Sequence, residues 1–247
     1  MTVKTKHLAL LLTLAATTLM AGCSHHVYSP PARAPSLRSA RNLKKGVTSV
    51  QAAAHMQGAV FGPEVAGGSV SVHRGITPEI ELGVDVTLLE VLGSSGANLD
   101  RGIYSGRVEG RFNPQRNHYV ALFSGLGGGY APAGGGFVSG DLGVTLGFEN
   151  CYVTPFTSLA ALVSVPINAR PVDTRVGVSD KPEISQAQTT FGAQYSFGAR
   201  VPLGGWSSCP QRVAPVTLAV GMGFTYLNDG DKTQGFLGMS GAVEFRF

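Results

Sequence analysis

The chain has 247 residues, enough for one large β domain or two ordinary domains. Only 14% of the residues are charged, against about 25% in a typical soluble domain, and 34 are glycine. Beyond the N-terminus no apolar run reaches the roughly 18 residues of a membrane-spanning helix. This excludes a helical membrane protein but allows a membrane β-barrel, whose strands give weak signals.

Residues 1–22 have the features of a secretory signal peptide. Two lysines precede the apolar run LALLLTLAATTLM, and small residues follow it. The segment LMAGC resembles the lipobox of bacterial lipoproteins, and this resemblance implies that Cys23 becomes the lipid-modified first residue. Met20 stands where leucine is commoner, and Ser24 follows the cysteine, not the aspartate that retains many such lipoproteins at the inner membrane. The alternative is an ordinary cleaved signal with an incidental cysteine.

Residues 23–45 are expected to form a lipidated, basic, disordered periplasmic linker. The stretch YSPPARAPSLRSARNLKKG contains proline and serine and is poor in apolar residues. Of the 19 basic residues in the chain, two lie in the signal and five in the linker, so residues 46–247 keep 12 against 15 acidic residues. The linker would be a solvated spacer, or it would be drawn to anionic head groups or other envelope polymers.

Residues 46–247 contain period-two segments between turn signals, which predict about ten strands. The expected spans are 46–61, 67–75, 79–91, 101–112, 117–129, 136–148, 151–165, 187–202, 215–227 and 234–247. Strands of this length can cross a membrane at a tilt, and the series leaves no room for ordinary helices. The pattern favours an all-β fold, a closed antiparallel up-and-down transmembrane barrel, with eight strands as the alternative.

The polar face of these strands indicates which side meets lipid. A soluble lipocalin-type barrel would turn its apolar face inward and cover its exterior with charges. Here the polar face is mostly Gly, Ser, Thr and Ala, which suits the interior of a membrane barrel. Aromatic residues also gather near the expected strand ends, as in the girdles of outer-membrane barrels.

A set of ionisable residues shares this inferred inner face and is predicted to form a lumenal charge network. Its members are Glu81, Asp85, Arg107, Glu109, Arg111, Asp141, Arg200, Glu244 and Arg246. Acids and bases on neighbouring strands could pair and fill the lumen. The alternative is a narrow aqueous path along the inward glycines Gly143, Gly192, Gly221 and Gly223.

The connections predict the topology of the barrel. If the tethered N-terminus is periplasmic, short turns face the periplasm, and the long segment at 166–185 faces outward. Cys151 and Cys209 then fall in periplasmic connections, and because the periplasm is oxidising, they are predicted to form a disulfide. Two unrelated free thiols are the alternative.

The terminal VEFRF resembles the signal that the barrel-insertion machinery reads in outer-membrane β-barrel proteins. Val243, Phe245 and Phe247 would carry that signal, and the same strand would close the barrel against the first. Together with the lipobox, the resemblance implies an outer-membrane location with the lipid anchor and both barrel termini on the periplasmic side.

No motif indicates catalysis. The segments around His55 and His73 lack the close His–Ser pair expected of a lipid A deacylase, and the chain has no G-x-S-x-G motif, so a lipid-modifying barrel enzyme is the least favoured interpretation. No cofactor, metal ion or nucleic acid is expected. Expected partners are outer-membrane lipids, the barrel-insertion and lipoprotein-processing machinery, and envelope proteins bound through residues 166–185 or the linker. The sequence favours a structural or interaction role over a small passive pore, and a trans-envelope complex for adhesion, secretion or motility is one setting for that role.

Overall fold

The computed structural model describes residues 26–58, 64–92, 102–114, 119–131, 135–150, 152–173, 184–203 and 214–247. No helix among these residues is long and apolar enough to span a membrane. Over this part of the chain, ten long strands form one closed antiparallel barrel, and two short strands form a separate hairpin. The all-β, ten-stranded barrel predicted from the sequence is therefore confirmed.

The long strands have 11 to 14 residues each. Their bounds are β1 Thr48–Gly58, β2 Glu64–Gly75, β3 Ile80–Leu92, β4 Gly102–Phe112, β5 Val120–Ala131, β6 Gly135–Gly147, β7 Thr154–Ile167, β10 Thr190–Leu203, β11 Val216–Asn228 and β12 Thr233–Arg246. The hairpin consists of β8 Val172–Asp173 and β9 Ile184–Ser185, within the segment expected to be one long loop.

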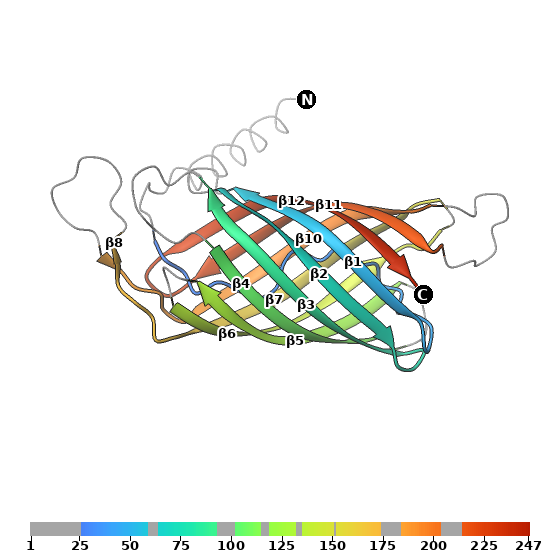
Figure 1. Cartoon of the computed structure of the whole chain (residues 1–247), viewed down its shortest axis with the longest axis horizontal. Helices are drawn as coiled ribbons and strands as arrows, with labels where there is room; N and C mark the ends of the chain where they lie inside the picture. The colour runs from blue at the N-terminus through green and yellow to red at the C-terminus, as the bar shows by residue number, and fades with distance from the viewer. Residues whose placement is uncertain are drawn as a thin grey trace, which may run out of the picture.

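Each long strand pairs with its neighbours in chain order, and β12 pairs with β1 to close the ring. The closing register places Ser49 opposite Arg246 and Gly58 opposite Leu237. Closure leaves no free sheet edge, as a spanning sheet in lipid requires. Figure 1 shows the strands tilted along the barrel, with the C-terminus at one end and the β8–β9 hairpin at the other.

The two faces of the sheet differ as the alternation predicts. Outward apolar side chains are exposed, including Leu82 at 49% and Val220 at 61% of their maximal area. Inward charged side chains are buried, with Arg107 at 4% and Glu109 at 6%. The membrane-barrel interpretation of the faces is thus supported, because water would not favour this exterior.

The barrel has two rims. The C-terminal rim carries Phe247, the turn 76–79, the first residues of β1, β3, β5, β7 and β11 and the last residues of β2, β4, β6 and β10. The hairpin rim carries the opposite strand ends, the turn 229–232 and the β8–β9 hairpin. Exposed aromatic side chains occur toward both, such as Tyr119 and Phe148 near the first and Tyr130 and Tyr226 near the second. Phe137, near the start of β6, points into the barrel in contrast to these and is 3% exposed.

Candidate functional site

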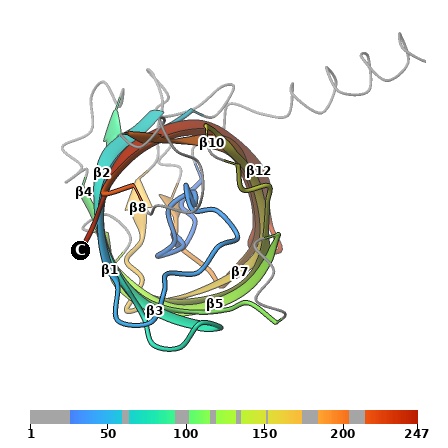
Figure 2. The ribbon, with the colours of Figure 1, turned by 90° about the vertical axis from the view of Figure 1, so that its right-hand side faces the viewer.

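The lumen of the barrel contains the N-terminal segment, residues 26–45, called the plug below. Figure 2 shows it as a blue trace inside the ring of strands. Lys45 forms a bridge with Gly75 at the C-terminal rim, whereas His26 contacts Asp229 at the hairpin rim. The plug therefore runs the length of the barrel.

This path differs from the expected linker. Residues 26–45 were expected to be part of a disordered periplasmic linker, yet most of them are buried, including Leu37 and Ala40. The segment is ordered because charges and hydrogen bonds from the wall hold it, together with the packing of Leu37 against Phe156 and Ala219. His26 and Phe247 lie at opposite rims, and Cys23, the expected lipid anchor, lies outside the described residues.

Polar side chains of the wall satisfy the backbone of the plug, which has no secondary structure of its own. The amide of Ser29 donates to Thr190 Oγ1 at 3.1 Å, and the amide of Ala32 donates to Ser139 Oγ at 2.9 Å. Arg111 donates to the carbonyl of Ser39 at 2.7 Å. Buried backbone groups need such partners, so the inward Ser, Thr and Arg residues hold the segment in place.

Inward glycines make room for the plug. A Cβ atom on Gly221 would lie 2.8 Å from Leu37 Cδ2, and one on Gly223 would lie 3.3 Å from Pro35 Cβ. At Gly192 and Gly143 the corresponding space is taken by side chains of the wall itself, Leu227 and Phe123. These glycines therefore do not line an open aqueous path.

One charge cluster joins the plug to the wall near the middle of the barrel. Arg33 Nη1 of the plug lies 3.2 Å from Asp141 Oδ1 and 3.3 Å from Glu109 Oε2. Arg107 binds the same two acids, at 2.6 Å from Asp141 Oδ2 and 2.7 Å from Glu109 Oε2, and reaches Asp85 Oδ2 at 2.8 Å. Two arginines thus face three carboxylates, so Arg33 supplies half of the positive charge that these two side chains bring to the cluster.

A second cluster lies closer to the C-terminal rim. Arg38 Nη2 of the plug lies 2.7 Å from Glu81 Oε1, and the amide of Leu43 donates to Glu81 Oε2 at 2.8 Å. His73 Nδ1 lies 3.4 Å from Glu81 Oε1, and its Nε2 atom lies 3.4 Å from Asp85 Oδ1. Glu81 is fully buried, so these partners are what keep its charge favourable.

The remaining predicted charges also lie on the inner wall. Arg111 Nε lies 3.8 Å from Glu109 Oε1. Arg200 and Arg246 both bind Glu244, and Arg200 also donates to the carbonyl of Leu37 at 3.4 Å. The structure thus brings the nine predicted residues together in the lumen, but as a network completed by the plug.

Sequence reasoning missed Arg33, Arg38 and His73 as members of this network. One signal was present: residues 46–247 carry more acidic than basic residues, and the segment before them carries five bases and no acid. That complementarity indicates an intramolecular partner. Assigning the segment to a tether left the excess acids of the lumen unpaired.

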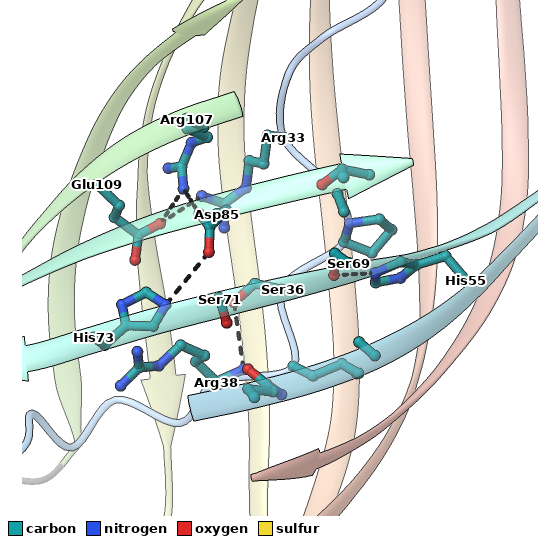
Figure 3. A pocket seen from close by; sticks show the side chains of 16 residues that line it. Arg33, Ser36, Arg38, His55, Ser69, Ser71, His73, Asp85, Arg107 and Glu109 are labelled. Atoms are coloured by element: carbon teal, nitrogen blue, oxygen red, sulfur yellow. Dashed lines mark hydrogen bonds and ion pairs between the residues drawn. The ribbon is translucent and has the colours of Figure 1, made fainter. Parts of the chain in front are cut away.

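A cavity of about 50 Å³ remains between the plug and strands β1 to β4. Figure 3 shows its lining, in which Arg33 and Arg38 of the plug lie among wall residues that include His55, His73 and Asp85. Water occupies polar cavities of at least about 10–15 Å³, so this one has space for a few molecules. It is too small for a larger ligand.

His55 contacts two serines that are distant from it in the sequence. Its Nε2 atom lies 2.8 Å from Ser69 Oγ, and its Nδ1 atom lies 2.9 Å from Ser240 Oγ. Both ring nitrogens are thus occupied by hydroxyl groups, and no carboxylate orients the ring as in a catalytic triad. His55 is 3% exposed inside the barrel, away from the lipid that a lipid-modifying site must reach.

The N-terminal end of the plug contacts the hairpin rim. His26 forms an ion pair with Asp229, and its Nδ1 atom lies 3.3 Å from Ser185 Oγ. Burial alone would raise the pKa of Asp229, but the His26 contact and the backbone amides of Lys232 and Asp231 outweigh it and lower the pKa below its usual value.

Tyr28 packs edge-on against the His26 ring, with centroids 4.8 Å apart. Burial, with the nearby Asp229 and Tyr226, raises the pKa of Tyr28 to about 12. The phenol is therefore neutral at physiological pH.

The other predicted site residues are only partly described. Cys23, Cys151 and Cys209 lie outside the described residues. Val243 and Phe245 lie in β12, the closing strand, and Phe245 and Phe247 are exposed on the outer face. This placement agrees with a closing strand that presents its apolar residues outward.

No protein-family model and no curated protein matches the chain. Among solved structures, the chain is similar to Neisserial surface protein A, at 15% identity and TM-score 0.41, covering 81% of this chain and 96% of that one. It is also similar to the β domain of the Bordetella autotransporter BrkA, at 10% identity and TM-score 0.43, covering 82% of this chain and 99% of that one. An outer membrane channel from Pseudomonas putida F1 matches at 10% identity and TM-score 0.40, covering 84% of this chain and 98% of that one. Similarity this low carries no inference about what the chain does.

Proposed function

We propose that this chain is an outer-membrane β-barrel lipoprotein with a structural or interaction role, and that its own N-terminal segment closes its lumen. The exterior supports the membrane placement, because apolar side chains cover it while the charges are enclosed. The observation that carries the closed state is the path of the plug through the barrel, from Lys45 to His26.

The plug favours a closed barrel over the passive pore. It occupies the space that inward glycines would otherwise leave, and two of its arginines pair with acids of the wall. With the lumen filled, we expect a partner protein to bind at one of the two rims. The connection 168–189, which includes the β8–β9 hairpin, is the proposed contact surface for another envelope protein.

Conductance in planar bilayers tests the closed state. The full chain is expected to show little conductance, and the double variant Arg33→Glu, Arg38→Glu is expected to open, because each new carboxylate faces the acids that held the arginine. Arg41→Glu is the matched control, because the ion pair between Arg41 and Glu149 is long, at 4.0 Å, and the Arg41 side chain is 26% exposed. Large, reproducible channels in the unaltered protein would refute a closed lumen.

Two further measurements test the envelope assignment. A closed barrel is expected to migrate faster on a gel before boiling than after it. Labelled palmitate should be incorporated by the unaltered chain and not by Cys23→Ser. Identical migration, or unchanged labelling in Cys23→Ser, would refute the barrel or the lipidation respectively.

A further inference from the structure

We infer that the N-terminal end of the plug leaves the barrel at the membrane face opposite its C-terminus, so that the lipid on Cys23 enters the cell-surface leaflet. The inference rests on the proposed function for the outer membrane and for lipidation. It replaces the expected periplasmic anchor with an acylated N-terminus displayed outside the cell, held there by the barrel that surrounds it.

The order of contacts along the plug fixes its direction. At the C-terminal rim, Leu43 binds Glu81 and Asn42 donates to the carbonyl of Glu79 at 2.7 Å. Midway, Arg33 binds Asp141 and Glu109. The partners of the plug therefore pass from the C-terminal rim toward the hairpin rim as the chain is followed back from Leu43 to His26.

The last described residues hold the segment against the hairpin rim. Ser29 Oγ lies 2.8 Å from Ser164 Oγ near the end of β7, and the carbonyl of Pro30 accepts from the same hydroxyl at 2.7 Å. The amide of Val27 donates to Ser185 Oγ at 3.2 Å, and His26 pairs with Asp229. These contacts come from three different connections or strand ends, which together surround the exit.

Chain length then limits where Cys23 can lie. Cys23 precedes His26 by three positions, and at about 3.6 Å per residue this stretch spans at most about 11 Å. The hydrocarbon core of a bilayer is about 30 Å thick. Acyl chains on Cys23 therefore cannot reach the leaflet at the C-terminal rim and must insert beside the hairpin rim.

The tight fit also implies an order of assembly. Leu37 and Arg33 are in contact with the wall, and the wall leaves a residual cavity of only about 50 Å³ beside them. A diacylated end cannot be drawn through a closed lumen of this kind. The strands must close around the segment, with the pairing of β1 and β12 coming last.

Surface labelling of intact cells tests the direction. Single cysteines are introduced as His25→Cys, Asp231→Cys on the hairpin rim and Ile76→Cys on the C-terminal rim, each with Cys151→Ser and Cys209→Ser. A membrane-impermeable maleimide is expected to label His25→Cys and Asp231→Cys on intact cells. Ile76→Cys should react only after the outer membrane is permeabilised.

The outcomes separate this inference from the proposed function. If Asp231→Cys reacts on intact cells and His25→Cys does not, the N-terminal exit is wrong while the outward hairpin rim stands. If Ile76→Cys reacts on intact cells in place of Asp231→Cys, the barrel is inserted the other way and the inference fails. Loss of the gel shift on boiling would instead refute the barrel.

Engineered disulfides provide a test that does not depend on exposure near the lipid. The pairs Ser29→Cys with Ser164→Cys and Ala40→Cys with Gly147→Cys should both form, because the first hydroxyls lie 2.8 Å apart and a Cβ on Gly147 would lie 3.4 Å from Ala40 Cβ. Ala40→Cys with Ser164→Cys is the control and should not form. Formation of the control pair alone would overturn the direction.

Discussion

Arg33 Nη1 in the plug lies 3.2 Å from Asp141 Oδ1 in β6, and the two residues are 108 positions apart in the chain. Both side chains are buried, and Arg107 binds the same carboxylate. The pair ties a segment without secondary structure to the wall of a closed barrel. Four predictions follow from this attachment and its surroundings.

Arg33→Met is expected to destabilise the folded barrel by about 3–5 kcal/mol, because removing one partner of a buried ion pair leaves the other charge uncompensated. The free energy of unfolding in urea, measured in detergent micelles, checks the value. Arg41→Met is the control in the same segment and should change it by about 0–1 kcal/mol, as a partly exposed pair does. Equal effects of the two variants would contradict the central role of Arg33.

Gly223→Leu is expected to displace the plug, because a Cβ at this position already lies 3.3 Å from Pro35 Cβ and the larger side chain has no other space. Protease digestion of the segment in detergent measures the displacement. Gly106→Leu adds the same side chain to the lipid-facing side, where the nearest atom to a Cβ is 4.0 Å away, and should leave the segment protected. Protection in both variants would show that Gly223 does not contact the plug.

The contact between His26 and Asp229 is expected to persist to acidic pH. Because the pKa of Asp229 is lowered in the folded protein, its ionised form stabilises docking above the ordinary aspartate pKa of about 3.9, and this contribution is lost as pH falls through the lower folded value. An environment-sensitive dye on Val27→Cys, in a chain lacking Cys151 and Cys209, reports the release.

The transition should therefore lie below about pH 4. Asp229→Asn is the control, because it has no carboxyl group to titrate and should lack this transition. A release centred well above the ordinary aspartate pKa, or one unchanged in Asp229→Asn, would contradict the assignment.

Cys151 and Cys209 are expected to form a disulfide in the oxidised envelope. Cys151 precedes β7 and Cys209 follows β10 in the sequence, and these two strands are neighbours with Thr154 opposite Arg200. The purified protein should migrate differently on gels with and without reductant, and Cys151→Ser should abolish the difference. Alkylation of two free thiols in the unreduced protein would refute the bond.

The sequence was sufficient to predict the wall of the barrel. A strand has a period of two, so the alternation in a segment such as IELGVDVTL predicts both an extended backbone and which residues share a face. The alternation placed Leu82 outward and Arg107 inward, and the structure confirms both. Ten strand spans were predicted to within a few residues, because turn residues interrupt each pattern.

Residues 26–45 show why the rest could not be read in this way. Their order comes from no period or propensity of their own; it comes from Arg33 and Arg38 meeting acids on β3, β4 and β6 and from hydroxyl groups that complete their backbone hydrogen bonds. Such contacts exist only once distant strands have closed into a ring. Local alternation therefore determined the barrel, and tertiary structure alone decided what fills it and at which rim the N-terminal segment ends.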